Sequence, residues 1–402
     1  MVNLPKEPPV PLLSLAEQYV RSIVPLPCSG APAPASPGLV LQDMPLAFSI
    51  ADAASKIEDL RQSSGICALA DSGLPLGTII AQALHKPLYL FRGRPWSIEG
   101  DPVPHSVYCH VPEGSTISMV DSHITMGHIA ATCAYYLSRR GVSVRSLFTP
   151  INLTPSAQSS REGLEGIRCH ALADLPSLRP FLSRYFRTSN DAQLNEVLSA
   201  VFRRPRDPVT PSPPTVEDQA LPPRSQRLMM MAKSVLRHRQ FPRVQYPHQR
   251  EASQLRQLFP SHEPNMWTVL TEPALLRQVT VLAQRALDLD SFDVILGTNY
   301  LGTSLALALA WHKNYAKPLI STLWLDGWDI LKSMPRDTSV LVCSMRIQTG
   351  LFVAAAIRRL KKYHIMPAAV LTFRYSPQRL RLPRSDILDE LSRLDIVVTA
   401  IS

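Results

Sequence analysis

The sequence predicts an α/β protein of two tandem units, each with a mainly parallel sheet and helices on both faces. Short apolar runs alternate with longer runs of helical period, and several short runs are apolar on both faces, as buried parallel strands are. The two halves of the chain also repeat one order of such runs. The length of 402 residues exceeds that of a usual single domain.

In the first half, each predicted strand leads through a turn into a predicted helix. In chain order we expect a helix at 46–64, the strand GICALA (65–70), a turn and helix at 71–84, the strand LYLFRGR (88–94), a strand and turn in VPEGSTISMVDSHITMG (111–127), a helix at 128–141, the strand VSVRSLFTPI (142–151) and a last strand near 166–175.

The second half repeats this order with different residues. We expect a helix at 272–290, the strand FDVILG (292–297), a helix from TNYLGTSLALAL (298–309), a strand in AKPLISTLWLDGW (316–328), a strand and turn in MPRDTSVLVCSMRIQTG (334–350), a helix at 351–364, the strand IMPAAVLTF (365–373) and a last strand near 394–402. In this comparison 111–127 aligns with 334–350 without a gap, and Leu76-Gly77-Thr78 aligns with Leu301-Gly302-Thr303.

Proline marks the boundaries between these parts, since the chain has 37 Pro and only 16 Gly. The segment 203–224 contains a dense Pro run, and a second one lies near the N-terminus. We therefore expect four parts: a Pro-rich N-terminal arm (1–44), a first unit (45–200), a Pro/Arg-rich linker (201–226) and a second unit (227–402).

The positive charge of the chain is concentrated in one segment near its middle. The sequence has 42 Lys and Arg against 32 Asp and Glu, and eleven of the bases but four of the acids lie between 203 and 256. Such a run could contact nucleic acid, although a solvated linker and helix surface is the interpretation we favour. The six Cys show no metal-ligand spacing, and no segment has the apolar length of a membrane span. We expect a cytoplasmic protein without membrane or metal site.

The stretch MVDSHITMGHIA carries the most specific signal. Asp121 stands at the end of a predicted strand, and Thr125 and Gly127 stand at the entrance of the next helix. A turn that feeds a helix N-terminus can hold a phosphate, and an acid at the strand end can hold sugar hydroxyls. Asp121 could alternatively be a simple helix cap. His123 and His128 fit no metal spacing, and we expect one or both to line the phosphate pocket.

The order strand, acid, x, x, Ile, Thr, x, Gly resembles the phosphoribosyl pyrophosphate (PRPP) motif of the type I phosphoribosyltransferase family, which has a Rossmann-like fold. ADSGLPLG (70–77) resembles the family's pyrophosphate loop, and LYLFRGR resembles its following strand and basic residue. The resemblance implies Mg²⁺ as cofactor and the following residues: Asp121 and Ser122 as catalytic residues on the sugar hydroxyls, Thr125, Met126, Gly127 and His128 on the 5′-phosphate, and Asp71, Ser72, Gly73 and Arg92 on the pyrophosphate.

The sequence departs from the family pattern in both halves. Ser122 stands where a second acid is expected, and in the second half Ser344 replaces the first acid. Gln348, Thr349 and Gly350 keep the outline of the phosphate loop, which could be vestigial. Arg92 could also be an ordinary solvated residue. Losing one carboxylate removes a charge-assisted hydrogen bond worth about 1.5 to 3 kcal/mol.

Two hypotheses follow for function. The first is an enzyme of the glycosyltransferase class that transfers phosphoribosyl from PRPP to a nitrogen nucleophile and releases pyrophosphate, with the second unit as a built-in partner that imitates a dimer. The second is a PRPP or nucleotide sensor, or a scaffold, without catalysis, and the missing acid favours it. A relation to PRPP synthetases ranks lower because no ATP-binding signature is evident. The acceptor, and a further homodimer, stay open.

Overall fold

The computed structural model describes most of both predicted units. The described residues are 11–24, 34–69, 71–92, 106–108, 110–154, 164, 166–202, 244–245, 268–322, 330–347, 351–365, 367–375 and 397–400. Apart from 244–245, the linker and the basic run between 203 and 256 lie outside these ranges. No helix in the described part of the chain has the length and apolar character needed to span a bilayer.

The first unit contains a sheet in the order β3-β2-β1-β4-β6-β5, with β7 also pairing with β6. All its pairs are parallel except β2 with β3. β4 pairs with the first part of β6 and β5 with its end, so that β5 continues the line of β4. The strands are β1 (Gly65–Leu69), β2 (Leu88–Arg92), β3 (Ser106–Tyr108), β4 (Thr116–Val120), β5 (His123–Ile124), β6 (Ser143–Asn152) and β7 (Arg168–Asp174).

The second unit contains a sheet in the order β10-β9-β11-β12-β13-β8, and all its pairs are parallel. Its strands are β8 (Val244–Gln245), β9 (Val294–Gly297), β10 (Leu319–Ser321), β11 (Val340–Ile347), β12 (Pro367–Tyr375) and β13 (Val397–Ala400). The predicted α/β class with mainly parallel sheets is therefore confirmed.

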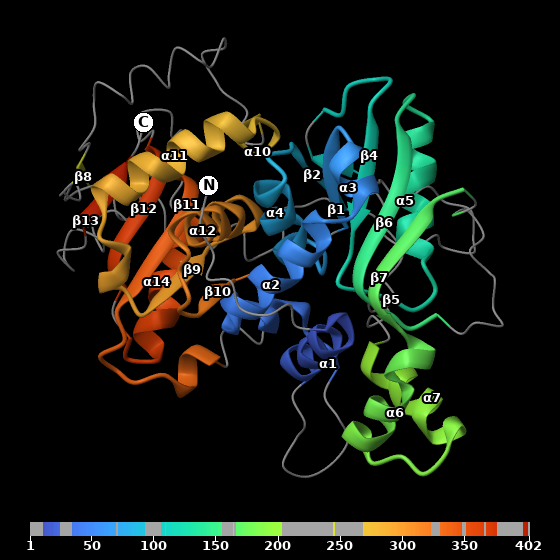
Figure 1. Cartoon of the computed structure of the whole chain (residues 1–402). Coiled ribbons are helices and arrows are strands. Elements are labelled where there is room, and N and C mark those ends of the chain that lie inside the picture. The colour runs from blue at the N-terminus through green and yellow to red at the C-terminus, as the bar shows by residue number, and fades with distance from the viewer. Residues whose placement is uncertain are drawn as a thin grey trace, which may run out of the picture.

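Helices form the layers on and between the two sheets (Figure 1). In the first unit they are α1 (Leu12–Ile23), η1 (Pro37–Gln42), α2 (Met44–Ser55), α3 (Glu58–Gln62), α4 (Leu74–Ala83), α5 (His128–Ser138), α6 (Leu175–Phe186) and α7 (Asp191–Phe202). In the second they are α10 (Thr268–Thr271), α11 (Pro273–Ala286), η3 (Leu289–Ser291), α12 (Tyr300–Lys313) and α14 (Leu351–Lys362). α5 and α14 cover the outer faces, and α4 and α12 lie between the sheets.

One apolar core runs through the middle of the molecule. It joins the inner faces of both sheets and includes side chains of α1, α2, α4, α11 and α12. α4 and α12 are buried along almost their whole length because each lies between its own sheet and the other unit. α1 and η1 belong to the segment predicted as a Pro-rich arm, yet they pack into this core, where Tyr19 and Ile23 are fully buried.

The registers of the two sheets correspond strand by strand. Ile66 pairs with Leu88 as Ile295 pairs with Leu319, and Ala68 pairs with Val120 as Gly297 pairs with Cys343. The agreement extends to the next two strands of each sheet. Val120 pairs with Phe148, which pairs with His170. In the same way, Cys343 pairs with Leu371, which pairs with Thr399. The ungapped alignment of 111–127 with 334–350 agrees with these registers over β4 and β11.

The alignment of Leu76-Gly77-Thr78 with Leu301-Gly302-Thr303 is wrong by about one helical turn. A Cβ on Gly302 would lie 2.6 Å from the carbonyl oxygen of Cys343, and a Cβ on Gly73 would lie 2.2 Å from that of Val120. Since Val120 and Cys343 correspond, Gly302 corresponds to Gly73. The helix ends agree: His85 and Asn314, with φ of 53° and 54°, each precede a residue whose N–H bonds back into the last turn at 2.8 Å.

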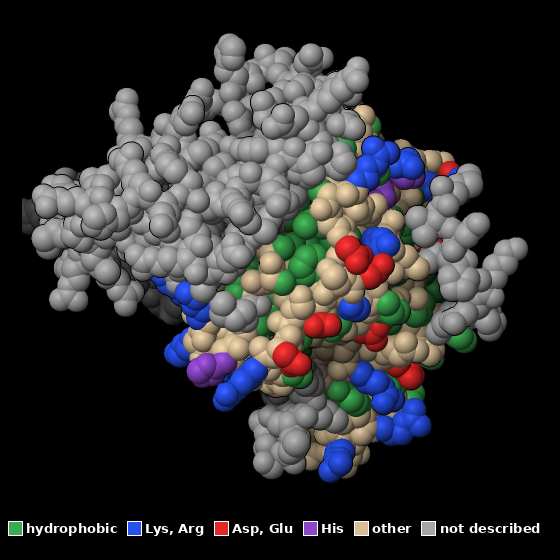
Figure 2. Space-filling view, turned by 90° about the vertical axis from the view of Figure 1, so that its left-hand side faces the viewer, with side chains coloured by type: hydrophobic (Ala, Val, Ile, Leu, Met, Phe, Trp, Pro, Cys, Tyr) green, Lys and Arg blue, Asp and Glu red, His purple; other side chains and the backbone are tan. Residues whose placement is uncertain are grey.

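Charged side chains of both signs are interspersed on the described part of the face shown in Figure 2. One ion-pair cluster reaches into the first unit, where the carboxylate of Asp59 accepts hydrogen bonds from Arg145 Nε at 3.0 Å and His170 Nε2 at 2.7 Å and an ion pair from Arg168 at 2.5 Å. Burial opposes the charge on Asp59, but these partners hold the pKa of its carboxyl below the usual value.

Candidate functional site

The carboxyl ends of β1 and β4 bring two of the predicted segments together. These strands are parallel neighbours, so the turn at 71–73 and Asp121 leave the sheet side by side. Ser72 Oγ donates a hydrogen bond of 2.6 Å to Asp121 Oδ1. Gly73 is required in this turn because any Cβ would collide with the carbonyl oxygens of Val120 and Leu69.

Asp121 and Ser122, the predicted sugar-binding residues, lie inside the protein. Asp121 is 5% exposed and Ser122 is 0% exposed. The backbone N–H of Ser122 donates to Asp121 Oδ1 at 2.8 Å, so one carboxylate oxygen already accepts two hydrogen bonds. This arrangement holds the acid in place, and it leaves little of the acid within reach of a sugar.

Tyr19 of α1 covers this acid from the inner face of the sheet. Its side chain is fully buried, and burial together with the negative charge of Asp121 raises the pKa of the phenol far above its ordinary value. The nearby Ser122 side chain lowers this pKa somewhat. Within the described residues, however, no group has the geometry of a hydrogen bond to the Tyr19 hydroxyl. The helix of the arm thus closes one side of the predicted site.

His123 does not line a phosphate pocket, contrary to one of the two alternatives expected from the sequence. Its ring is buried, with Nδ1 2.8 Å from Ser122 Oγ and Nε2 3.3 Å from the carbonyl oxygen of Phe202 in α7. The rings of His123 and Phe202 also meet edge to face. The histidine therefore ties the end of the sheet to α7.

The turn Thr125–His128 is the open part of the predicted site. Met126 is 55% exposed, His128 is exposed, and Thr125 is half-buried. Gly127 has φ of +77°, a conformation that other residues rarely adopt, and it immediately precedes α5. Among the described residues no side chain caps this end of α5, so its first N–H groups and the positive end of its dipole face the turn.

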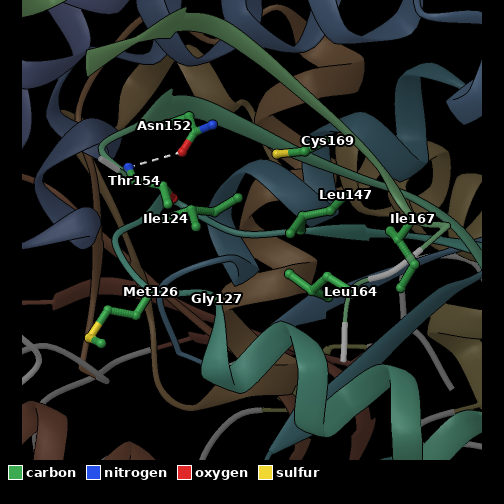
Figure 3. Close-up of a pocket in the computed structure, with 9 residues that line it drawn as sticks. All are labelled: Ile124, Met126, Gly127, Leu147, Asn152, Thr154, Leu164, Ile167 and Cys169. Carbon is green, nitrogen blue, oxygen red and sulfur yellow. Dashed lines mark hydrogen bonds between the residues drawn. The ribbon is translucent and has the colours of Figure 1, made fainter. Parts of the chain in front are cut away.

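A small pocket lies beside this turn, on the α5 side of the sheet (Figure 3). Leu147 and Cys169 line it from β6 and β7, and Leu164 and Ile167 line it from the segment before β7. A side-chain hydrogen bond between two lining residues, from the Thr154 N–H to Asn152 Oδ1 at 3.1 Å, lies at the end farthest from α5. The pocket is mostly apolar and therefore suits packing under the turn better than binding of an anion.

The remaining predicted residues are placed only in part. Arg92 ends β2 beside β1, which puts its backbone at the same sheet edge, but its side chain lies outside the described residues. Ser344 is buried within β11, which runs without a break through the position where Asp121 and Ser122 separate β4 from β5. Gln348, Thr349 and Gly350 lie outside the described residues.

The turn that enters α12 in the second unit is closed by its own side chains. Asn299 Oδ1 accepts from the Gly302 N–H at 2.8 Å and so caps the helix. The N–H and Oγ1 of Thr298 both donate to the Cys343 carbonyl oxygen at 3.1 Å. By contrast, no side chain in the described part of the chain caps α4 at Gly73. The two units therefore differ at equivalent turns.

Two site residues escaped the sequence analysis. Tyr19 lies far from Asp121 in the chain and falls in the segment predicted to be a Pro-rich arm. Tyr300 of α12 donates a hydrogen bond from its hydroxyl to Asp71 Oδ1 in the other unit. The corrected register would have pointed to this contact, because Tyr300 takes the place of Asp71 in the second unit.

The described residues do not by themselves form a magnesium site. Asp121 is buried and bonded to Ser72, and Asp71, the other acid at this edge, accepts from Tyr300. Within the described part of the chain, no three His, Cys, Asp or Glu side chains lie together in a way that could hold a metal ion. Magnesium at this edge would need most of its oxygen ligands from a bound phosphate compound.

Comparisons with known proteins give structural likenesses only. No protein-family model and no curated protein matches the chain. Orotate phosphoribosyltransferase from Aeropyrum pernix is 22% identical over 42% of this chain and 97% of its own, with a TM-score of 0.33. UMP synthase of Leishmania donovani is 17% identical over 46% of this chain and 41% of its own, with a TM-score of 0.35. Adenine phosphoribosyltransferase from Trypanosoma brucei, solved with AMP, pyrophosphate and ribose-5-phosphate, is 16% identical over 42% of this chain and 82% of its own, with a TM-score of 0.33.

Proposed function

We propose that the first unit is a phosphoribosyltransferase-like binding module that holds the phosphate of a phosphorylated ribose, with PRPP as the expected ligand, and does not transfer it. The observation that carries this proposal is a contrast within one motif. The turn Thr125–His128 is open, whereas Asp121 and Ser122 are buried against α1. The phosphate half of the motif is accessible and the sugar half is closed.

The open turn has the properties of an anion site. An α-helix of 11 residues begins at His128, and no described side chain caps it, so its first N–H groups and its dipole attract negative charge. The positive φ of Gly127 lets the backbone turn toward the ligand without a side chain in the way. Thr125 and His128 add a hydroxyl and an imidazole at the same place.

The closed acid argues against transfer. A phosphoribosyl transfer passes through a state with positive charge on the ribose, and a carboxylate stabilises that state only when it reaches the sugar. Asp121 instead accepts from Ser72 Oγ and the Ser122 N–H, and Ser122 has no exposed surface. Opening this pair would leave polar groups to be satisfied again, at a cost of about 1 to 3 kcal/mol.

The proposal assigns the ligand to the first unit alone. In the second unit the turn that corresponds to 71–73 is capped by Asn299, and β11 is continuous where β4 and β5 are separate. We also propose that the two units arose by duplication, which the strand-by-strand registers support. Magnesium would arrive with the pyrophosphate oxygens of the ligand rather than in a protein cage.

The test is calorimetric titration of the full chain with PRPP, ribose 5-phosphate and inorganic phosphate, with and without Mg²⁺. Thr125→Glu places a negative charge in the turn, and Ser138→Glu places the same charge at the far end of α5 as a matched control. An acid is tolerated at a helix N-terminus, so Thr125→Glu should fold. We expect binding to the wild type and to Ser138→Glu, and at least about tenfold weaker binding to Thr125→Glu.

Turnover is measured in parallel as pyrophosphate release from PRPP across a set of bases and amines. We expect none, and we expect Asp121→Asn to leave PRPP affinity unchanged because its amide oxygen can still accept from Ser72. Release of pyrophosphate that disappears in Asp121→Asn would establish the transferase instead. Absence of binding in the wild type would refute both functions.

A further inference from the structure

The two units meet through equivalent elements. α4 and α12 occupy the same place in their units, and they pack against each other in the central core (Figure 1). Because Gly73 corresponds to Gly302, Asp71 corresponds to Tyr300, and these are the two residues that form a hydrogen bond across the contact. The bond therefore joins equivalent positions, as a contact near a two-fold axis does.

This contact is held by further bonds between the units. His312 Nε2 lies 3.2 Å from Gln82 Oε1, and Gln42 Nε2 donates to the carbonyl oxygen of Leu319 at 3.2 Å. The rings of Phe48 and Trp311 meet edge to face, with centroids 5.2 Å apart. A hydroxyl that projects from α12 is consequently fixed relative to the first unit.

The Asp71–Tyr300 contact depends on the difference between the units. Two copies of the first unit in this arrangement would set Asp71 against Asp71, and like charges at short distance repel. Replacing one of the two by Tyr300 converts the repulsion into a hydrogen bond to a charged acceptor, which is stronger than a neutral one. The second unit thus supplies a hydrogen-bond donor for Asp71, which a second copy of the first unit would not supply.

We propose that Tyr300 is a positioning residue, through which the second unit holds the turn at 71–73 in the shape that receives the ligand's pyrophosphate. The proposal rests on the proposed function for the identity of the ligand. Tyr300 binds Asp71 and draws its charge away from the turn, where an approaching anion would otherwise meet a carboxylate. The second unit is then a fixed partner of the site rather than a second site.

The experiment measures hydrogen exchange at the amides of Ser72 and Gly73 in the ligand-free full chain, and then pyrophosphate affinity by calorimetry. Tyr300→Phe removes only the hydroxyl, and Tyr363→Phe removes one from a tyrosine of the same unit that bonds Arg359 instead. We expect Tyr300→Phe to speed exchange at both amides about fivefold and to weaken pyrophosphate about fivefold, with no change in Tyr363→Phe.

A double-variant comparison separates positioning from general loss of stability. In an Asp71→Ala background, Tyr300→Phe should have no further effect on exchange or affinity, because its partner is already gone. Unchanged exchange in Tyr300→Phe, or additive effects in the double variant, would overturn the proposal. If the wild type binds no pyrophosphate but exchange rises as expected, the positioning role stands and the proposed function fails.

Discussion

Lowering the pH should lower the free energy of unfolding because of one histidine at the contact between the units. Neutral His312 of α12 donates from Nε2 to the side-chain oxygen of Gln82 in α4. Burial first, and then the positive charges of Arg277 and His85, lower the pKa of His312 to about 4. A proton on this ring would be both poorly solvated and next to two other bases.

The magnitude follows from the two pKa values. Between about pH 6.5 and pH 4, His312 is protonated in the unfolded chain but stays neutral in the folded chain. The free energy of unfolding therefore falls as the pH falls through this window. The full shift from 6.5 to about 4 is worth about 3 kcal/mol. The side chain is partly in contact with solvent, which screens the neighbouring charges, so we expect about half of this value.

The assay is urea unfolding at about pH 7 and about pH 4.5 for the wild type, His312→Gln and His110→Gln, the last being an exposed histidine of the first unit. Glutamine can still bond Gln82 but cannot take a proton. We expect His312→Gln to lose about 1.5 kcal/mol less than the wild type on acidification, with His110→Gln like the wild type. Equal losses in all three would refute the assignment of this titration to His312.

Three further predictions concern the first unit. Gly73→Ala should destabilise the protein by about 2 to 4 kcal/mol, since its Cβ would lie 2.2 Å from a backbone carbonyl oxygen, and an unchanged melting temperature would contradict this close approach. Asp59→Asn should cost about 2 kcal/mol at neutral pH by unpairing Arg145 and its neighbours, and the cost should shrink as acid protonates Asp59 in the wild type, whose carboxyl pKa lies below the usual value. Cys67 and Cys133 are buried 3.9 Å apart, and burial raises the pKa of the Cys133 thiol, so a thiol reagent should label both only on unfolding and fast labelling of the native chain would be the contrary result.

The hydrophobic pattern was sufficient to predict most of the strands. GICAL and VILG are buried at every residue, as runs apolar on both faces predict for central parallel strands. The pattern did not fix α12, because every residue from Gly302 to Ala310 is buried and no polar face marks the phase of the helix. Without a polar face, the matching Leu-Gly-Thr triplets of the two sequences suggest an alignment that lies one turn away from the structural one.

The sequence could predict only those parts of the site that are formed by residues close together in the chain. The order of Thr125, Gly127 and the following helix is local, and the structure places the turn as expected at the start of α5. The closure of Asp121 depends on Tyr19, which no local pattern connects to it. The contact of Asp71 with Tyr300 depends in turn on how two separate units pack. Side chains that meet across such distances in the chain leave no periodic signal.

The first unit carries arrangements that lower its stability at places where the second unit has stabilising ones, and this difference supports a binding site in the first unit. β11 is one continuous strand and Asn299 caps α12, and each of these features stabilises its unit. At the equivalent places the first unit interrupts β4 and leaves α4 without a side-chain cap, and it also buries a carboxylate there. A missing cap alone costs about 1 kcal/mol. Local arrangements that lower stability persist in folded proteins mainly where they serve binding or catalysis. Since the same fold exists in this chain without them, the first unit does not need them to fold.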